Sequence, residues 1–177
     1  RGERCLYVTL SESEEEIQGV AASHGFSLEG IIIYDLSLVE HQLREDEENS
    51  LFHPAEVDLH ETTQPVLHQI AEQRPARVVF DSLSELRMLA VNPLRYRRRI
   101  LALKQHLAKH GCTTLFLDDG TSDPKGDLQL QSLAHGVIAL EHVAQNYGSE
   151  RRRLQVTKLR GLRFRGGYHD FRIRTGG

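Results

Sequence analysis

The feature that most constrains the fold is the segment formed by residues 75–87, PARVVFDSLSELR. Its first part, residues 77–80, is a short apolar run rich in β-branched side chains, which is typical of a strand buried on both faces. Such strands occur mainly in parallel sheets covered by helices, so the run predicts an α/β fold. Ligands of these folds bind at the carboxyl ends of the strands, where Asp81 stands.

Asp81 has two interpretations. A carboxylate at a strand end can hold the water shell of a Mg²⁺ ion, as an acidic residue does in many phosphate-handling enzymes. Asp81 also suits the N-cap of a helix, because helical spacing resumes directly after it. The residues alone leave both roles open.

The length and composition bound the class of protein. The chain has 177 residues, enough for one domain with a substantial core and too few for two comfortable ones. Hydrophobic residues make up 39%, and no apolar run reaches membrane-spanning length, so we expect a soluble, cytoplasmic, single-domain protein. Cys5 and Cys112 stand in apolar strand-like runs, and we expect them to be buried free thiols.

The charge is unevenly distributed along the chain. Residues 150–177 contain nine Lys/Arg against two acids (+7), whereas residues 1–149 contain 13 Lys/Arg against 23 acids (−10). This asymmetry indicates either a nucleic-acid surface or a charge-complementary contact with a neighbouring copy. Aromatic residues are sparse among the arginines and the body of the chain is acidic, and both observations argue against nucleic-acid binding.

The periodicity of apolar residues predicts the order of the elements. Strands buried on both faces are expected at residues 4–10, 31–35, 77–80 and 112–117, and helices at 13–24, 62–73 and 94–110. Ser13 and Glu16 have the spacing of a capping box, and Gly25 is a typical helix end. The inward faces of the three helices are expected to carry Ile17, Val20, Ala21 and His24; Val66, Leu67 and Ile70; and Ile100, Leu103 and Leu107.

The remaining segments are less regular. Residues 36–61 predict a long, partly ordered surface excursion, and residues 121–131 predict a mobile loop. Period-two alternation at 136–142, 153–159 and 168–173 predicts antiparallel strands. The expected architecture is therefore an α/β fold, a mostly parallel sheet flanked by helices that ends in an antiparallel hairpin or meander.

Taken together, these segments resemble the KaiC family of RecA-type ATPases. The matching stretches are YVTLSE (7–12), RVVFDS (77–82), CTTL (112–115), ERRR (150–153) and KLRG (158–161). The closing ERRR and KLRG stretches are the most specific, because many folds contain an apolar strand that ends in Asp. Matches occur in order over residues 5–173, and the resemblance implies a RecA-like fold for nearly the whole chain.

The resemblance also implies an activity. KaiC-type domains bind ATP with Mg²⁺ between subunits of a ring, which by resemblance is a homo-hexamer, and hydrolyse it in regulatory or signalling roles; some relatives transfer the phosphoryl group to a protein hydroxyl. In this chain Asp81 would be the Walker B carboxylate and tentative Mg²⁺ ligand. Lys158, Leu159 and Arg160 would contact nucleotide, and Lys158 and Arg160 would reach the γ-phosphate of the neighbour's ATP. Ser23 matches a helix position near the nucleotide.

The position of the catalytic acids differs from the family pattern. The first strand of the family ends in two adjacent acids, the first of which activates the attacking water. Here the two positions are Ser11 and Glu12, so Glu12 alone remains to act as a base or to orient water and Mg²⁺. The alternative to an ATPase is therefore a catalytically degenerate scaffold of the same fold, and a RecA-like nucleic-acid-binding protein is a lesser alternative.

Two further departures concern phosphate binding. The family continues KLRG with small or polar residues and a His, whereas this chain has Leu162, Arg163 and Phe164. No G-x-x-x-x-G-K-[ST] stretch occurs, and residues 120–125 lack its second Gly and its Lys-Ser pair. In the family, that stretch comes before the strand that corresponds to residues 4–10 of this chain. We therefore expect this chain to be a fragment that begins after that stretch and that binds ATP poorly by itself.

Overall fold

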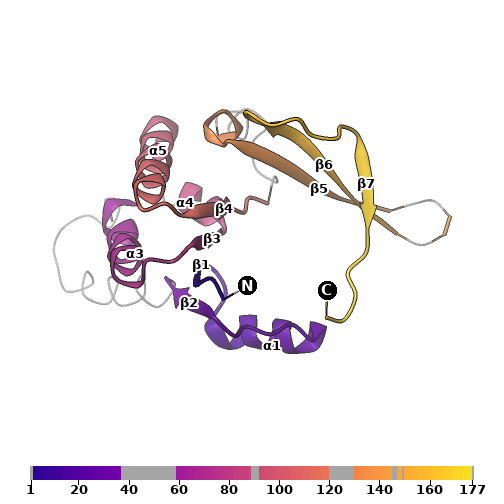
Figure 1. The fold of residues 1–177 in the computed structure, drawn as a ribbon, viewed down its shortest axis with the longest axis horizontal. Helices are drawn as coiled ribbons and strands as arrows, with labels where there is room; N and C mark the ends of the chain where they lie inside the picture. Colours follow the sequence, from indigo (N-terminus) through magenta and orange to yellow (C-terminus); the bar gives the residue numbers. More distant parts are fainter. Residues whose placement is uncertain are drawn as a thin grey trace. The chain divides into compact units, whose positions relative to one another are not determined.

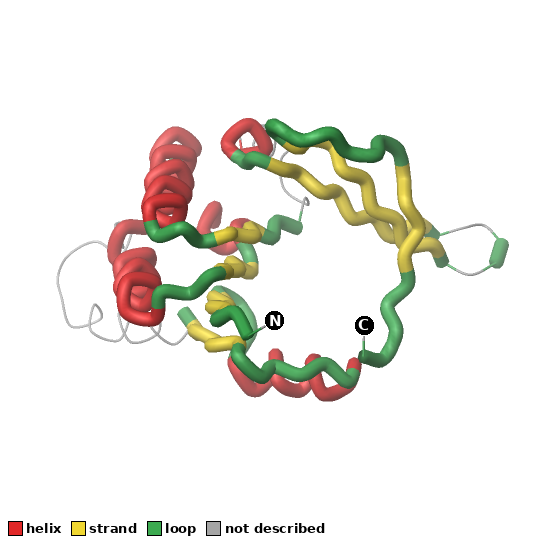
Figure 2. The backbone as a smooth tube through the Cα atoms, in the orientation of Figure 1, coloured by secondary structure: helices red, strands yellow, loops and turns green. Residues whose placement is uncertain are grey.

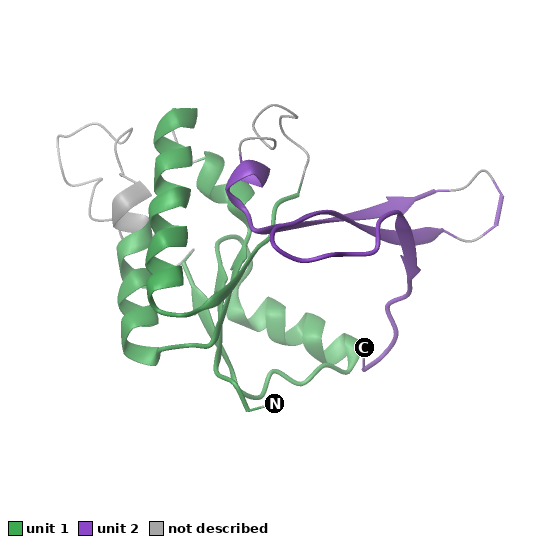
Figure 3. Cartoon of the chain, turned by 45° about the horizontal axis from the view of Figure 1, so that its top comes forward, with its two compact units in different colours: residues 1–123 green, residues 124–177 purple. Residues whose placement is uncertain are grey.

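The computed structural model of the protein describes residues 2–36, 59–88, 92–119, 130–144, 147–148 and 150–176, with the backbone alone for residues 59–62. These residues belong to two compact units, Arg1–Asp123 and Pro124–Gly177, and each unit is described by itself (Figure 3). Residues 37–58 of the excursion predicted at 36–61 lie outside the described residues. The same is true of residues 121–129 of the loop predicted at 121–131.

Unit 1 contains a four-stranded sheet in the order β2-β1-β3-β4 (Figure 1). The strands are β1 (Cys5–Thr9), β2 (Ile31–Asp35), β3 (Arg77–Asp81) and β4 (Thr113–Phe116). All three neighbouring pairs are parallel, and β1 and β3 occupy the two central positions. The predicted mostly parallel α/β fold is therefore confirmed.

The helices of unit 1 are α1 (Glu14–His24), α3 (Leu59–Gln73), α4 (Leu83–Met88) and α5 (Pro93–Lys109). In Figure 1, α3 and α5 lie together on one face of the sheet and α1 lies on the other. None of the described helices is long and apolar enough to cross a membrane. The main core forms on the α3 and α5 face, and its buried side chains include Leu6, Val8, Val66, Ile70, Val78, Phe80, Ile100, Leu103 and Leu107.

The sequence predicted the start and end of α1 correctly but not its buried face. Ser13 and Glu16 form the capping box, and Gly25 ends the helix with φ 68°. Of the expected inward residues only Ala21 is buried, while Val20 is 56% exposed. The helix lies against the edge strand β2, which offers it less apolar surface than a central strand would.

Two strands predicted to be buried on both faces are edge strands instead. Every residue of β2 is half-buried, and Leu115 of β4 is 57% exposed. An edge strand has a neighbour on one side only, so its side chains are covered less completely. Cys5 and Cys112 are likewise half-buried rather than buried, because Cys5 begins β1 and Cys112 directly precedes β4.

Unit 2 is an antiparallel sheet in the order β5-β6-β7 (Figure 2). Its strands are β5 (Gly136–Val143), β6 (Arg151–Leu159) and β7 (Tyr168–Phe171), so the predicted closing meander is confirmed and forms a sheet of its own. A short helical turn at residues 130–133 precedes β5, where the sequence predicted that the loop would continue to residue 131.

Candidate functional site

Three polar residues lie side by side at the carboxyl edge of the parallel sheet. Thr9, the last residue of β1, stands opposite both Asp35 at the end of β2 and Asp81 at the end of β3. Thr9 is buried, and the backbone N–H of Leu10 donates to the Asp81 carbonyl at 2.9 Å. Asp81 is therefore at the strand tip where the sequence placed it, in the position at which ligands of parallel sheets bind.

Tyr7 holds the Asp81 carboxylate. Its hydroxyl donates a hydrogen bond to Asp81 Oδ2. Tyr7 precedes Thr9 by two residues, so both side chains project from the same face of β1. Burial raises the pKa of the Tyr7 phenol, and the hydrogen bond to Asp81 raises it further. The phenol therefore stays protonated and keeps donating to the carboxylate.

Glu12 is held near the strand tips by the turn that joins β1 to α1. The Thr9 hydroxyl donates to the Glu12 carbonyl at 2.7 Å and accepts from the Glu12 backbone N–H at 3.1 Å. The side chain of Glu12 is exposed. The buried Thr9 thus fixes the backbone of Glu12 beside the strand tips, while the Glu12 carboxylate stays in solvent.

A pocket of about 200 Å³ lies on the α1 side of the sheet. Tyr7 and Glu12 line it together with apolar side chains of α1, of β2 and of the segment between them. Pockets that enclose a drug-sized ligand usually have roughly 300–1,000 Å³. This one is therefore too small to enclose a nucleotide.

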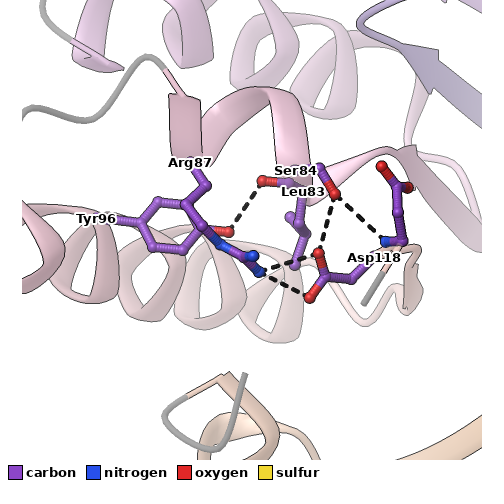
Figure 4. Close-up of polar contacts among 6 residues, drawn as sticks. Leu83, Ser84, Arg87, Tyr96 and Asp118 are labelled. Atoms are coloured by element: carbon purple, nitrogen blue, oxygen red, sulfur yellow. Dashed lines mark hydrogen bonds and ion pairs between the residues drawn. The ribbon is translucent and has the colours of Figure 1, made fainter. Parts of the chain in front are cut away.

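Asp118 follows β4 and is engaged by α4 (Figure 4). Arg87 Nη2 donates to both carboxylate oxygens of Asp118, at 3.0 and 2.8 Å, and the Ser84 hydroxyl donates to Oδ1 at 3.0 Å. Tyr96 supports the same region by donating to the Leu83 carbonyl at 3.1 Å. Asp118 therefore lies in an ion pair with Arg87, which the sequence did not predict.

Lys158 and Arg160, at the end of β6 in unit 2, bind the same group of backbone carbonyls. Lys158 Nζ donates to the carbonyls of Gln131 at 2.6 Å and Ser132 at 3.3 Å, and Arg160 Nη2 donates to the Ser132 carbonyl at 2.7 Å. These carbonyls belong to the helical turn at 130–133, whose carboxyl end favours cations. Leu159, between the two cations, is half-buried. The two predicted cations are thus adjacent.

Ser23 lies near the carboxyl end of α1. It is the penultimate residue of α1, roughly 13 Å along the helix from its first residue. Its hydroxyl donates to the Val20 carbonyl at 2.7 Å and contacts His24 Nδ1 at 2.9 Å, so its described contacts are local. A nucleotide-binding role for Ser23 stays a prediction.

Comparison with known protein families shows to which family the chain belongs. The family model described as "ATPase: KaiC" matches residues 1–177. The chain belongs to the KaiC ATPase family. A crystal structure of a KaiC-like protein from the hyperthermophilic archaeon Pyrococcus horikoshii OT3 superposes with a TM-score of 0.74 and 22% identity, over 99% of this chain and 75% of that one. At this identity the likeness shows the fold, and it confirms the RecA-like architecture. No match was found among curated proteins.

The contact between Tyr7 and Asp81 in this KaiC family member predicts a pH dependence of stability. We expect Tyr7→Phe to lower the free energy of unfolding at pH 7 by about 1–3 kcal/mol, the usual cost of leaving a partly buried hydrogen-bonding group without its partner. In the wild type the pKa of Tyr7 is raised on folding, so its contribution is complete below the unfolded value near 10 and is lost as the pH rises above it. Urea unfolding between pH 7 and pH 11 measures both effects.

Tyr147, which is 94% exposed, provides the matched control for this measurement. Tyr147→Phe should leave both the stability and its alkaline decline unchanged. If Tyr7→Phe kept the full alkaline decline of the wild type, the Tyr7–Asp81 hydrogen bond would not be the source of the pH dependence.

Proposed function

We propose that the protein binds Mg·ATP at the carboxyl edge of the unit 1 sheet and hydrolyses it at the contact between subunits of a homo-oligomeric ring, in a regulatory role. Members of this family generally bind ATP with Mg²⁺ and are generally oligomeric. The observation that carries the proposal is the position of Asp81, at the tip of a central strand, beside Thr9 and oriented by Tyr7.

The carboxylate and hydroxyl oxygens at this edge are suited to a Mg²⁺ ion that binds together with a nucleotide. The described part of the chain has no group of three or more His, Cys, Asp or Glu that could hold a metal by itself. Mg²⁺ usually keeps several waters and binds through one or two carboxylates plus substrate phosphates, so Asp81 suffices as its protein partner. When bound, the ion would offset charge on the phosphate oxygens.

The other residues then have separate roles. Glu12, fixed through its backbone by Thr9, would orient the attacking water or accept its proton. Lys158 and Arg160 of one subunit would bind the γ-phosphate in the neighbour. In the structure they donate to neutral carbonyls, and a phosphate oxygen would be a stronger acceptor for these two cations because it carries a negative charge.

Asp81→Asn tests the site directly. In the natural protein we expect this change to weaken Mg²⁺-dependent ATP binding by about 10–100-fold, because the amide keeps the size of the side chain but loses the charge that holds the ion's water shell. Titration of a fluorescent ATP analogue with and without Mg²⁺ measures the effect. Asp118→Asn is the matched control, and its Mg²⁺ dependence should stay that of the wild type. If Asp81→Asn also kept it, Asp81 would have only a structural role.

A non-catalytic scaffold is the second candidate function. Ser11 favours it, because Ser occupies the position at which the family carries its first catalytic acid. A scaffold would form the oligomer without turning over ATP. Phosphate release by the assembled natural protein distinguishes the two, and Ser11→Glu should create or increase turnover only if the rest of the site is competent.

A further inference from the structure

Unit 2 contains a second candidate site, a pocket of about 800 Å³. It is formed by Glu150 and the first two residues of β6, the last two residues of β7 and the three residues that follow β7. Four arginines contribute to its lining: Arg151, Arg152, Arg172 and Arg174. The pocket is at the opposite end of β6 from Lys158 and Arg160, about 20 Å along the strand, so it is separate from the cations of the proposed ATPase site.

The charge of this arginine pocket is not balanced within the pocket. Its two carboxylates are already paired, Asp170 with Arg151 at 2.5 Å and Glu150 with His142 at 2.8 Å. The residues that the structure describes supply no carboxylate partner for the remaining three arginines, Arg152, Arg172 and Arg174. Unit 2 as a whole has 10 Lys/Arg against 4 Asp/Glu, a net charge of +6. The pocket therefore favours an anionic ligand.

The position of β7 indicates the shape of that ligand. Among the described strands β7 pairs with β6 alone, so its other side is an open edge to which an extended chain can add through backbone hydrogen bonds. Charged and apolar residues alternate from Asp170 to Arg174, with Phe171 and Ile173 between the charges. Arg172 and Arg174, two residues apart, both line the pocket. That spacing matches alternate residues of an extended segment.

We propose that the arginine pocket binds an extended acidic segment of another protein, whose carboxylates two residues apart pair with Arg172 and Arg174 while its backbone adds to the edge of β7. Guanidinium groups bind carboxylates through two parallel hydrogen bonds, and the pocket already holds the Asp170 carboxylate on Arg151. Single-stranded nucleic acid fits less well. It needs several aromatic platforms, and Phe171 is the one aromatic side chain among the residues that line the pocket.

Fluorescence anisotropy with the 177-residue chain tests this site without ATP. The probe is a labelled ten-residue peptide in which Glu alternates with Val and Ser, compared with the same peptide carrying Gln at every Glu position. We expect Arg172→Gln/Arg174→Gln to raise the Kd for the Glu peptide by about tenfold, since two exposed ion pairs are lost. Arg163→Gln/Arg165→Gln removes the same charge from exposed positions outside the pocket and should change the Kd less than about twofold.

Three results would overturn the proposal. Equal weakening by both double variants would mean general electrostatic attraction rather than a site. Tighter binding of a ten-nucleotide oligo-dT with the same dependence on Arg172 and Arg174 would assign the pocket to nucleic acid. Equal affinity for a peptide of the same composition with its Glu residues in one block would exclude addition of a strand to β7. Arg152→Gln is the second variant, in case the double variant loses its far-ultraviolet circular dichroism spectrum.

Discussion

Replacing Arg160 with alanine is expected to lower ATP turnover by the assembled natural protein about a thousandfold. The nucleotide affinity of isolated subunits should stay nearly the same, because the proposed role of Arg160 is to offset transition-state charge on the neighbour's nucleotide. Phosphate release at saturating ATP measures the first quantity. Titration of a fluorescent ATP analogue under conditions that keep the subunits apart measures the second.

Subunit mixing makes this test specific for action across a contact. Arg160→Ala subunits retain Asp81, and Asp81→Asn subunits retain Arg160, so a mixed form of the proposed ring would contain some contacts with both groups intact. Turnover by the mixture should exceed that of either variant alone. Arg163→Ala, at an exposed position three residues further along, should stay close to the wild type. Equal loss of nucleotide affinity in isolated Arg160→Ala subunits would contradict the proposed role.

Arg160 also has a structural role, and a conservative variant separates the two. Arg160 Nη2 donates to the Ser132 carbonyl at 2.7 Å, so alanine removes this contact together with the charge. Arg160→Lys keeps a cation that can still donate to a carbonyl, but it lacks the planar fork that binds two phosphate oxygens at once. We expect Arg160→Lys to preserve the thermal stability of the protein and to recover little of the turnover.

The order of the elements could be predicted from the sequence because the signals are local. The apolar run of β3, the capping box of α1 and the alternation along β5 and β6 each depend on neighbouring residues alone, and the structure contains all of them. The burial of β2 and β4 could not be predicted in the same way. Ile31, Ile32 and Ile33 form the same β-branched run in an edge strand as in a central one, and strand order is a property of the whole sheet.

The candidate site was predicted in part for the same reason. Asp81 could be placed at a strand tip, because a strand followed by an acid is a pattern within one segment. Its partner Tyr7 is 74 residues away, and the contact depends on the parallel register of β1 and β3. A weak signal did exist. Tyr7 stands two residues before the end of its strand, so its hydroxyl lies on the same face of the sheet as the residue at the strand end. The Arg87–Asp118 pair had no comparable signal.

For the cations of unit 2, the residues could be predicted from the sequence but their contacts could not. Their residue types and spacing could be matched to a family. Their partners could not be predicted, because the loop expected at residues 121–131 covers the start of the helical turn at 130–133, which supplies the carbonyls that they contact. The cross-strand contacts of Arg153 could not be predicted either. Its guanidinium pairs with Glu141 at 2.7 Å, and its Cζ atom lies 3.9 Å from the centre of the Tyr168 ring. These contacts follow from the register of β5, β6 and β7.

Phe80→Ala is expected to have the largest effect on stability, a loss of about 3–5 kcal/mol in the free energy of unfolding. Phe80 is 1% exposed, lies in the central strand β3, and packs against Phe116 of β4 with ring centroids 5.3 Å apart. Deleting the ring leaves a cavity between the sheet and its helices. Domains of this kind are typically stable by about 5–15 kcal/mol, so the midpoint of urea unfolding should fall steeply.

Leu115→Ala in the adjacent strand is the matched control, because Leu115 is 57% exposed and its loss should cost less than about 1 kcal/mol. Equal effects of the two changes would mean that the core does not lie on the α3 and α5 face. Phe80 also directly precedes Asp81, so a cavity there can disturb the site as well as the fold. Phe80→Leu refills most of the volume, and if it recovers stability without recovering Mg²⁺-dependent binding, the aromatic ring itself positions the Asp81 carboxylate.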